Sequence, residues 1–167
     1  QDAGRIWSEK LTQALQTKID DDQAITTIVQ RYGHAFSIGY QEAYLAKQTL
    51  HDISKIEDAL AGPHFTLDLY KDYTCAPHQV RLKIYHKGTP IVLSDALPLL
   101  ENMGLRTVSE LPFSVLPAGS NEIFWIHDFS LDMKDGHAPA FDKKATETKQ
   151  KFEDALTRIW YGEMEND

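Results

Sequence analysis

The stretch Val80-Arg-Leu-Lys-Ile-Tyr85 alternates apolar and polar side chains, and so does Phe65-Thr-Leu-Asp-Leu-Tyr70 before it. A period of two places every second side chain on the same face of a β-strand. Residues 65, 67 and 69 then share one apolar face, residues 80, 82 and 84 share another, and the opposite face of 80–85 is mostly charged. Both stretches are therefore predicted to be half-buried antiparallel strands, joined by a loop.

Two further strands follow these two. A short helix is predicted over Asp95–Met103, with Ser94 as its N-terminal cap and Gly104 at its end. The next strands are predicted over 105–115 and 123–133, the first of them bent at a proline.

A final helix begins near Phe141 and is predicted to end at Gly162. Its apolar stripe consists of Phe141, Ala145, Thr148, Phe152, Leu156, Ile159 and Trp160. The resulting order of elements is β-β-α-β-β-α. This order predicts an α+β fold, a four-stranded antiparallel sheet with two helices on one face. It is the ferredoxin-like architecture read with its first strand moved to the end.

The chain before this sheet is predicted to be helical. Apolar residues recur at three- and four-residue spacing over 5–33, and the Asp20-Asp21-Asp22 run offers a cap between two helices. Residues 37–60 continue the pattern with Ser37 as a cap, and Gly62-Pro63 ends it. We therefore expect a helical segment over 1–62, a ferredoxin-like domain over 63–162 and a tail over 163–167.

Composition excludes several classes of function. The net charge of −8 argues against a nucleic-acid partner and against an anionic membrane surface, both of which need clustered lysine and arginine. The single Cys75 excludes an internal disulfide and a cysteine-based zinc site, and it is expected to be a free thiol. No run of 18 apolar residues occurs, so no membrane span is expected, and a cytoplasmic location is predicted.

No catalytic residue and no metal site can be assigned from the sequence. It contains no phosphate loop, no dinucleotide fingerprint and no compact metal-ligand spacing among its seven histidines. His127 and Asp128 are neighbours on a predicted strand, so they point to opposite faces and cannot form a dyad. His127 shares the apolar face of its strand and is expected to be a core histidine with satisfied hydrogen bonds.

One loop is a candidate for binding an effector. Asp135, Gly136 and His137 lie between the fourth predicted strand and the last helix. Backbone N–H groups at a helix start can bind a carboxylate or another anion. Small regulatory domains with a ferredoxin-like fold often bind amino acids at such a loop, although a plain turn is the alternative interpretation.

Several strings of residues resemble the large bacterial NAD-dependent glutamate dehydrogenases. They are Arg31-Tyr-Gly-His-Ala-Phe36, His51-Asp-Ile53, Leu93-Ser-Asp95, Leu97-Pro-Leu-Leu-Glu-Asn-Met-Gly-Leu105 and Trp125-Ile-His-Asp-Phe129. The resemblance runs from about residue 20 to residue 133. One departure is Ser37, where many relatives carry a proline.

The resemblance implies a non-catalytic, ACT-like regulatory or assembly domain cut from the N-terminal side of a longer enzyme. That parent would oxidise L-glutamate to 2-oxoglutarate and ammonium while reducing NAD. No cofactor is expected within this stretch, and its partners would be the rest of the parent chain and the other subunits of a homo-oligomer. An amino-acid-sensing module that binds its effector at 132–137 is the first alternative. A stand-alone small enzyme is the second, and it would need a cleft with a perturbed histidine or carboxylate.

Overall fold

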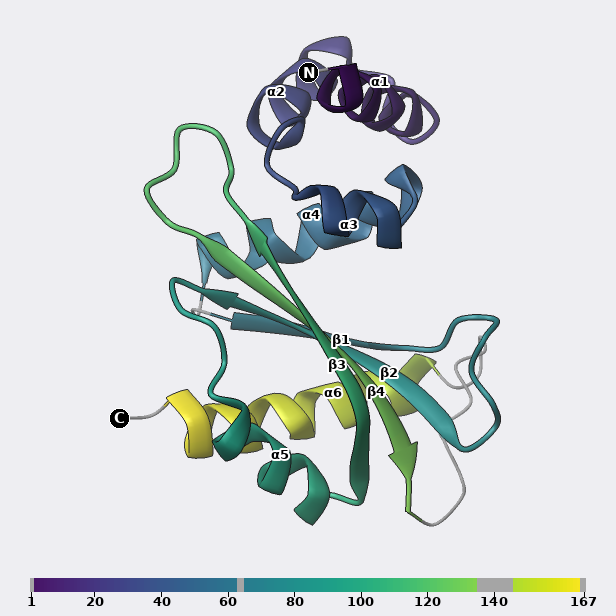
Figure 1. Ribbon diagram of the computed structural model, residues 1–167, viewed down its shortest axis with the longest axis vertical. Coiled ribbons are helices and arrows are strands. Elements are labelled where there is room, and N and C mark those ends of the chain that lie inside the picture. Colours follow the sequence, from purple (N-terminus) through teal and green to yellow (C-terminus); the bar gives the residue numbers. More distant parts are fainter. Residues whose placement is uncertain (1, 63–64, 135–145, 166–167) are drawn as a thin grey trace. The chain divides into compact units, whose positions relative to one another are not determined.

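Figure 1 shows the computed structural model, which describes residues 2–62, 65–134 and 146–165, with the backbone alone at 2–3 and 146–148. It confirms the α+β class, with a four-stranded antiparallel sheet and an N-terminal helical segment. The strands are β1 (Phe65–Tyr70), β2 (Gln79–Lys87), β3 (Leu105–Val115) and β4 (Phe124–Met133). Their order across the sheet is β1-β2-β4-β3, so β2 and β4 are inner strands and β1 and β3 are edges.

The chain forms two compact units, which we describe separately. The first contains residues 1–65, 85–89 and 113–126, and the second contains residues 66–84, 90–112 and 127–167. Every strand contributes residues to both units.

Four helices make up most of the first unit: α1 (Asp2–Gln16), α2 (Asp22–Tyr32), α3 (Ile38–Ala43) and α4 (Ala46–Ala61). Two of the predicted caps are confirmed. The Asp21 carboxylate accepts the N–H of Gln23 at 3.0 Å at the start of α2. The Ser37 hydroxyl accepts the N–H of Tyr40 at 3.2 Å at the start of α3.

Side chains of these helices and of the strand residues 85, 113, 115, 124 and 126 form one core. Its buried members are Trp7, Leu11, Leu15, Ile25, Tyr32, Ala35, Phe36, Tyr40, Ile53, Ile56, Ala59, Tyr85, Val115, Phe124 and Ile126. This burial explains why α1, α2 and α4 are amphipathic, since each turns its apolar face inward.

Gly33 follows the last residue of α2 without adopting a left-handed conformation. Its φ is −59°, an ordinary right-handed value. A Cβ at this position would lie 2.6 Å from the Val29 carbonyl oxygen and 2.9 Å from the Ser8 hydroxyl. Glycine is therefore required here by close packing of the backbone.

The second unit is built on the remaining strand residues and two helices, α5 (Leu93–Asn102) and α6 (Thr146–Trp160). Figure 1 draws both helices on the same side of these strands. Its buried apolar residues are Leu67, Leu69, Val80, Leu82, Ile84, Ile91, Ala96, Leu100, Leu105, Phe129, Leu131, Leu156 and Trp160. The predicted apolar faces of β1 and β2 are thus confirmed.

Helix α6 also protects the edge of the sheet at β1. The Glu153 carboxylate, buried to 9% exposure, accepts the Leu69 N–H at 2.7 Å. An edge strand otherwise presents unpaired backbone groups that can recruit another chain. A helix side chain occupies one of them here.

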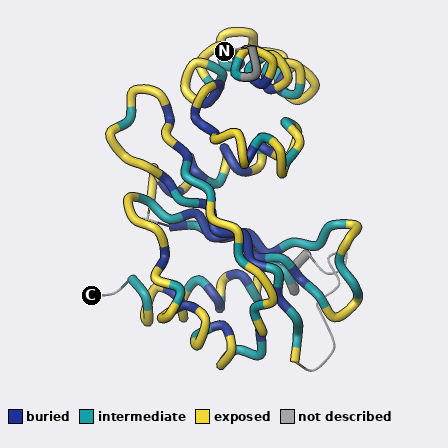
Figure 2. The backbone as a smooth tube through the Cα atoms, viewed as in Figure 1, coloured by how far each residue is buried: buried dark blue, intermediate teal, exposed yellow. Residues whose placement is uncertain are grey.

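The prediction that β2 is half-buried with a charged, solvated face is wrong. Lys83 and Tyr85 are 5% and 0% exposed, although they lie on the face opposite Leu82 and Ile84. Figure 2 shows the inner strands in dark blue through the middle of the sheet. The alternation of apolar and polar residues indicated that β2 has one buried face, but as an inner strand it buries residues on both faces.

The helix ends differ from the predictions in two places. Helix α5 begins after Val92 without a side-chain cap, so Ser94 lies inside the helix. Gly162 does not end the last helix, because a π-helical turn over Tyr161–Glu165 continues α6. Trp160 is fully buried, whereas its neighbour Tyr161 is 47% exposed.

Candidate functional site

The predicted effector loop falls mostly outside the described residues. Asp135, Gly136 and His137 all lie there, and only the end of β4 that leads to them can be examined. The Met133 N–H donates to the His78 carbonyl at 2.8 Å, and the next N–H, of Lys134, donates to a carbonyl at 3.0 Å. The entry to the loop is therefore fixed to its neighbours within the second unit.

A small charged group surrounds Asp132 at this entry. Its carboxylate lies 3.7 Å from Nη2 of Arg106, whose side chain is 64% exposed. It also lies 3.8 Å from Nε2 of His78. A guanidinium and a carboxylate side by side are the two charges that would complement an amino-acid zwitterion.

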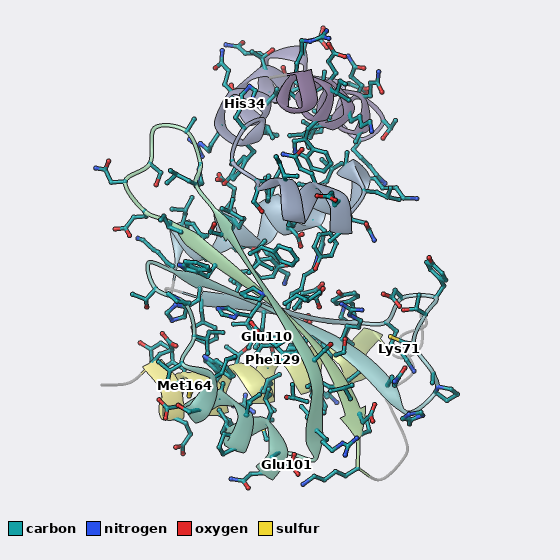
Figure 3. All side chains as sticks on the ribbon, in the orientation of Figure 1. His34, Lys71, Glu101, Glu110, Phe129 and Met164 are labelled. Atoms are coloured by element: carbon teal, nitrogen blue, oxygen red, sulfur yellow. The ribbon has the colours of Figure 1, made fainter. Side chains whose placement is uncertain are left out.

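His127 is a buried histidine with both ring nitrogens engaged, as predicted. Nε2 accepts the Ile91 N–H at 3.0 Å, and Nδ1 lies 2.6 Å from Oε2 of Glu110. Because a backbone N–H can only donate, Nε2 is unprotonated and Nδ1 carries the proton. Figure 3 labels Glu110 beside Phe129, whose ring stacks with that of His127 at a centroid distance of 6.3 Å. This arrangement joins β3, β4 and the segment before α5, and it leaves neither nitrogen open to a substrate.

Asp128 faces the other way and is held by a separate set of donors, which confirms that it forms no dyad with His127. Its carboxylate is fully buried and accepts a hydrogen bond from Nη2 of Arg81 at 2.9 Å. The Tyr70 hydroxyl lies 3.0 and 2.9 Å from the two carboxylate oxygens. Burial alone would lower the pKa of Arg81, but the charge and hydrogen bond of Asp128, with Tyr70 and the charge of Asp72, together outweigh burial and raise it. Arg81 therefore remains charged, as a buried carboxylate requires.

A second buried carboxylate, Asp52 of α4, lies in the first unit. It accepts the hydroxyls of Tyr85, at 2.6 Å, and of Tyr40. Burial raises the pKa of Tyr40 well above its ordinary value, and the Asp52 charge raises it further. The phenol therefore stays protonated and keeps donating. No spacing rule marks these three residues, which meet from α3, α4 and β2.

The helices of the first unit enclose a groove of about 740 Å³. Its apolar lining comes from α2, from α4 and from the end of α1 with the turn that follows it. These residues are Leu15, Ile19, Ile28, Leu50 and Ile53. Leu15 and Ile53 are buried, and the other three are partly exposed.

Charged side chains mark the two ends of this groove. At one end, Nη1 of Arg31 binds both oxygens of Glu57 at 3.0 Å, and the Tyr32 hydroxyl donates to the same carboxylate. These contacts bring together the C-terminal ends of α2 and α4. Lys18 precedes α2 and Lys47 begins α4, so both lysines belong to the opposite end.

Three other expectations can be examined directly. Burial raises the pKa of the Cys75 thiol, which is free and therefore stays protonated at neutral pH. Within 2–62, 65–134 and 146–165, no group of three His, Cys, Asp or Glu side chains is arranged to hold a metal ion. In the same ranges, no helix has the length and apolar character needed to span a bilayer.

The α+β fold, a four-stranded antiparallel sheet preceded by a helical segment, is consistent with an ACT-like domain. A family model described as "Glutamate dehydrogenase, ACT3 domain" matches residues 64–145, and one described as "Glutamate dehydrogenase, helical motif 2" matches residues 14–59. The chain belongs to the NAD-specific glutamate dehydrogenase family, which confirms the resemblance seen in the sequence.

Relatives in three bacteria carry the name NAD-specific glutamate dehydrogenase. The protein of Halomonas elongata is 34% identical over 163 residues, which is 98% of this chain and 10% of the relative. The proteins of Pseudomonas aeruginosa and Mycobacterium tuberculosis are each 27% identical over 99% of this chain and 10% of their own length. The chain therefore spans about a tenth of the length of these relatives.

Proposed function

We propose that this chain is a non-catalytic regulatory and assembly module of a larger NAD-dependent glutamate dehydrogenase. The whole enzyme would oxidise L-glutamate to 2-oxoglutarate and ammonium with NAD, in the cytoplasm and as a homo-oligomer. We assign the helical module to residues 1–62, the ACT-like domain to 63–162 and a tail to 163–167. NAD would bind elsewhere in the parent chain.

The observation that carries this proposal is the way in which the buried ionisable groups are used. Asp52, Asp128 and His127 each have hydrogen-bonding partners within the fold, and each of them joins separate elements. A general acid or base needs a lone pair or proton within reach of a substrate. The lone pairs and protons of these groups are used in hydrogen bonds within the fold. This favours a structural module of the enzyme over a catalytic one.

The test compares the isolated chain with the whole enzyme. The 167-residue chain should form no NADH from glutamate and NAD, whereas the parent enzyme should. In the parent, Arg81→Met should alter the subunit assembly measured by light scattering on a sizing column. Glutamate turnover by the isolated chain would contradict the proposal. So would an Arg81→Met enzyme that loses turnover per intact active site while its assembly is unchanged.

A second candidate function is the sensing of an amino acid at 132–137. The pair of Arg106 and Asp132 at the entry of this loop favours it, because the guanidinium could bind the carboxylate and Asp132 the amino group of the effector. Titration calorimetry of the parent enzyme with a panel of amino acids tests it. The heat should vanish in Arg106→Ala and persist in the matched variant Arg158→Ala on α6. Absence of heat with every amino acid would refute the sensing role.

A further inference from the structure

The groove of the first unit has the shape of a binding site for one additional helix. We infer that it binds an amphipathic helix from another part of the enzyme chain to which this segment belongs. The inference rests on the proposed function. If the parent enzyme is as long as the relatives, this chain is a tenth of it, and the bound helix comes from the other nine-tenths.

The lining of the groove follows two helix faces. On α4 the lining residues are 47, 50, 51, 53, 54, 57 and 58, and on α2 they are 27, 28, 31 and 32. Spacings of three and four keep these side chains on one face of each helix. The α4 face is about 16 Å long at 1.5 Å per residue, which is three turns. Two helix faces on either side of an apolar floor are typical of grooves that bind an amphipathic helix.

The charges at the two ends determine which helix fits. Lys18 and Lys47 are exposed, and neither forms an ion pair with any residue that the structure describes. At the other end Glu57 is already paired with Arg31, which leaves the exposed carboxylate of Asp58. The groove thus has a basic end and a weakly acidic end.

An occupant with complementary charge carries acidic side chains opposite Lys18 and Lys47. The negative end of its helix dipole, the C-terminus, is favoured at the same place, and its positive N-terminus is favoured near Asp58. The helix therefore runs antiparallel to α4. Its apolar residues recur at i, i+3 or i+4, and i+7, because they must contact the floor over three turns.

Site-specific photo-crosslinking in the parent enzyme tests this inference. A benzophenone amino acid replaces Ser54, an exposed residue of α4 that lines the groove. The same label replaces Ile38 in a control, because Ile38 is 66% exposed and belongs to α3, away from the groove lining. Mass spectrometry should find the Ser54 label joined to one amphipathic segment of the same enzyme chain, outside the 167 residues, and the Ile38 label should not reach that segment.

The charges are tested by the double variant Lys18→Glu and Lys47→Glu, which should lower the yield of this crosslink about tenfold. The matched double variant Lys10→Glu and Lys151→Glu changes two exposed lysines outside the groove and should leave the yield unchanged.

Two results would overturn the inference. One is a fully photolysed Ser54 label that has joined no peptide, which would mean that the groove is open to solvent. The other is a crosslink to a second copy of this segment. Neither result touches the proposed function, whose failure would appear as glutamate turnover by the isolated chain.

Discussion

Asp128 and Asp52 are buried carboxylates held by donors from other elements of the fold. Asp128 receives Arg81 and Tyr70, and Asp52 receives Tyr40 and Tyr85. Removing one partner of such a group costs more than the hydrogen bond itself, because the other partner stays buried and unsatisfied. These positions should therefore be the most sensitive single residues of the fold.

Asp52→Ala should lower the free energy of unfolding by about 3 kcal/mol, because two buried tyrosine hydroxyls lose their acceptor and a cavity remains. Urea denaturation followed by circular dichroism measures this. Asp58→Ala, six residues further along α4 and exposed, is the control and should change the value by less than about 0.5 kcal/mol. Equal effects of the two substitutions would contradict the role given to Asp52.

The carboxyl of Asp72 leads to a prediction about how stability depends on pH. Burial alone would raise the pKa of its carboxyl, but hydrogen bonds from the Thr74 side chain and N–H, with the charge of Arg81, outweigh burial and lower it. A lowered folded pKa stabilises the protein above the unfolded pKa, near 3.8, and this stabilisation is lost as pH falls through the folded pKa. Asp72→Asn should therefore destabilise the chain at pH 7 and have a diminishing effect below pH ~4 in acid titrations of stability. A penalty of constant size down to the acid end would exclude this charge effect.

At the scale of the elements, the sequence patterns predicted most of the helices and strands. Period-two alternation placed β1 and β2 correctly, and Asp21 and Ser37 marked the starts of α2 and α3. The wrong predictions concern which residues of an element are buried by neighbouring elements. Lys83 was expected in solvent because it is charged, yet its ammonium lies 5.5 Å from the centre of the Tyr70 ring on another strand. Local periodicity contains no information about such a partner.

Two glycines of the helical module should respond in opposite directions to alanine. Gly33→Ala should destabilise by about 1–3 kcal/mol, since its Cβ would overlap the Val29 carbonyl and the Ser8 hydroxyl. Gly39→Ala lies within α3, where the nearest atom to a Cβ is the Ser37 hydroxyl at 3.9 Å. It should be neutral or stabilising by up to about 1 kcal/mol. Thermal unfolding of both variants beside the parent chain measures the contrast, and a stabilising Gly33→Ala would refute the packing argument.

At the scale of the whole molecule, the sequence predicted the α+β class and the family but not the groove. The groove needs α1, α2 and α4 to meet, and the contact between Arg31 and Glu57 that aligns two of them spans 26 residues. The predicted loop of Asp135, Gly136 and His137 stays a proposal for a different reason, since it lies outside the described residues.

Cutting the chain at residue 145, where the ACT3 family model ends, should destroy the second unit. The cut removes α6 and with it the buried Glu153, Leu156 and Trp160. The apolar face that these residues cover, and the Leu69 N–H, would then meet solvent. Sizing chromatography should show aggregation of residues 1–145, whereas a chain ending at residue 165 should elute as the uncut chain does. A soluble piece ending at 145 that melts at the same temperature would contradict this view of α6.

The fixed proton of His127 has a spectroscopic consequence. A hydrogen held between an imidazole nitrogen and the Glu110 carboxylate, on a residue only 2% exposed, exchanges slowly with water. Such a proton resonates far downfield of the amide region, a range in which proteins show few signals. Without any label, that one signal would report whether β3 and β4 are still joined while the chain is heated, truncated or assembled into the full enzyme.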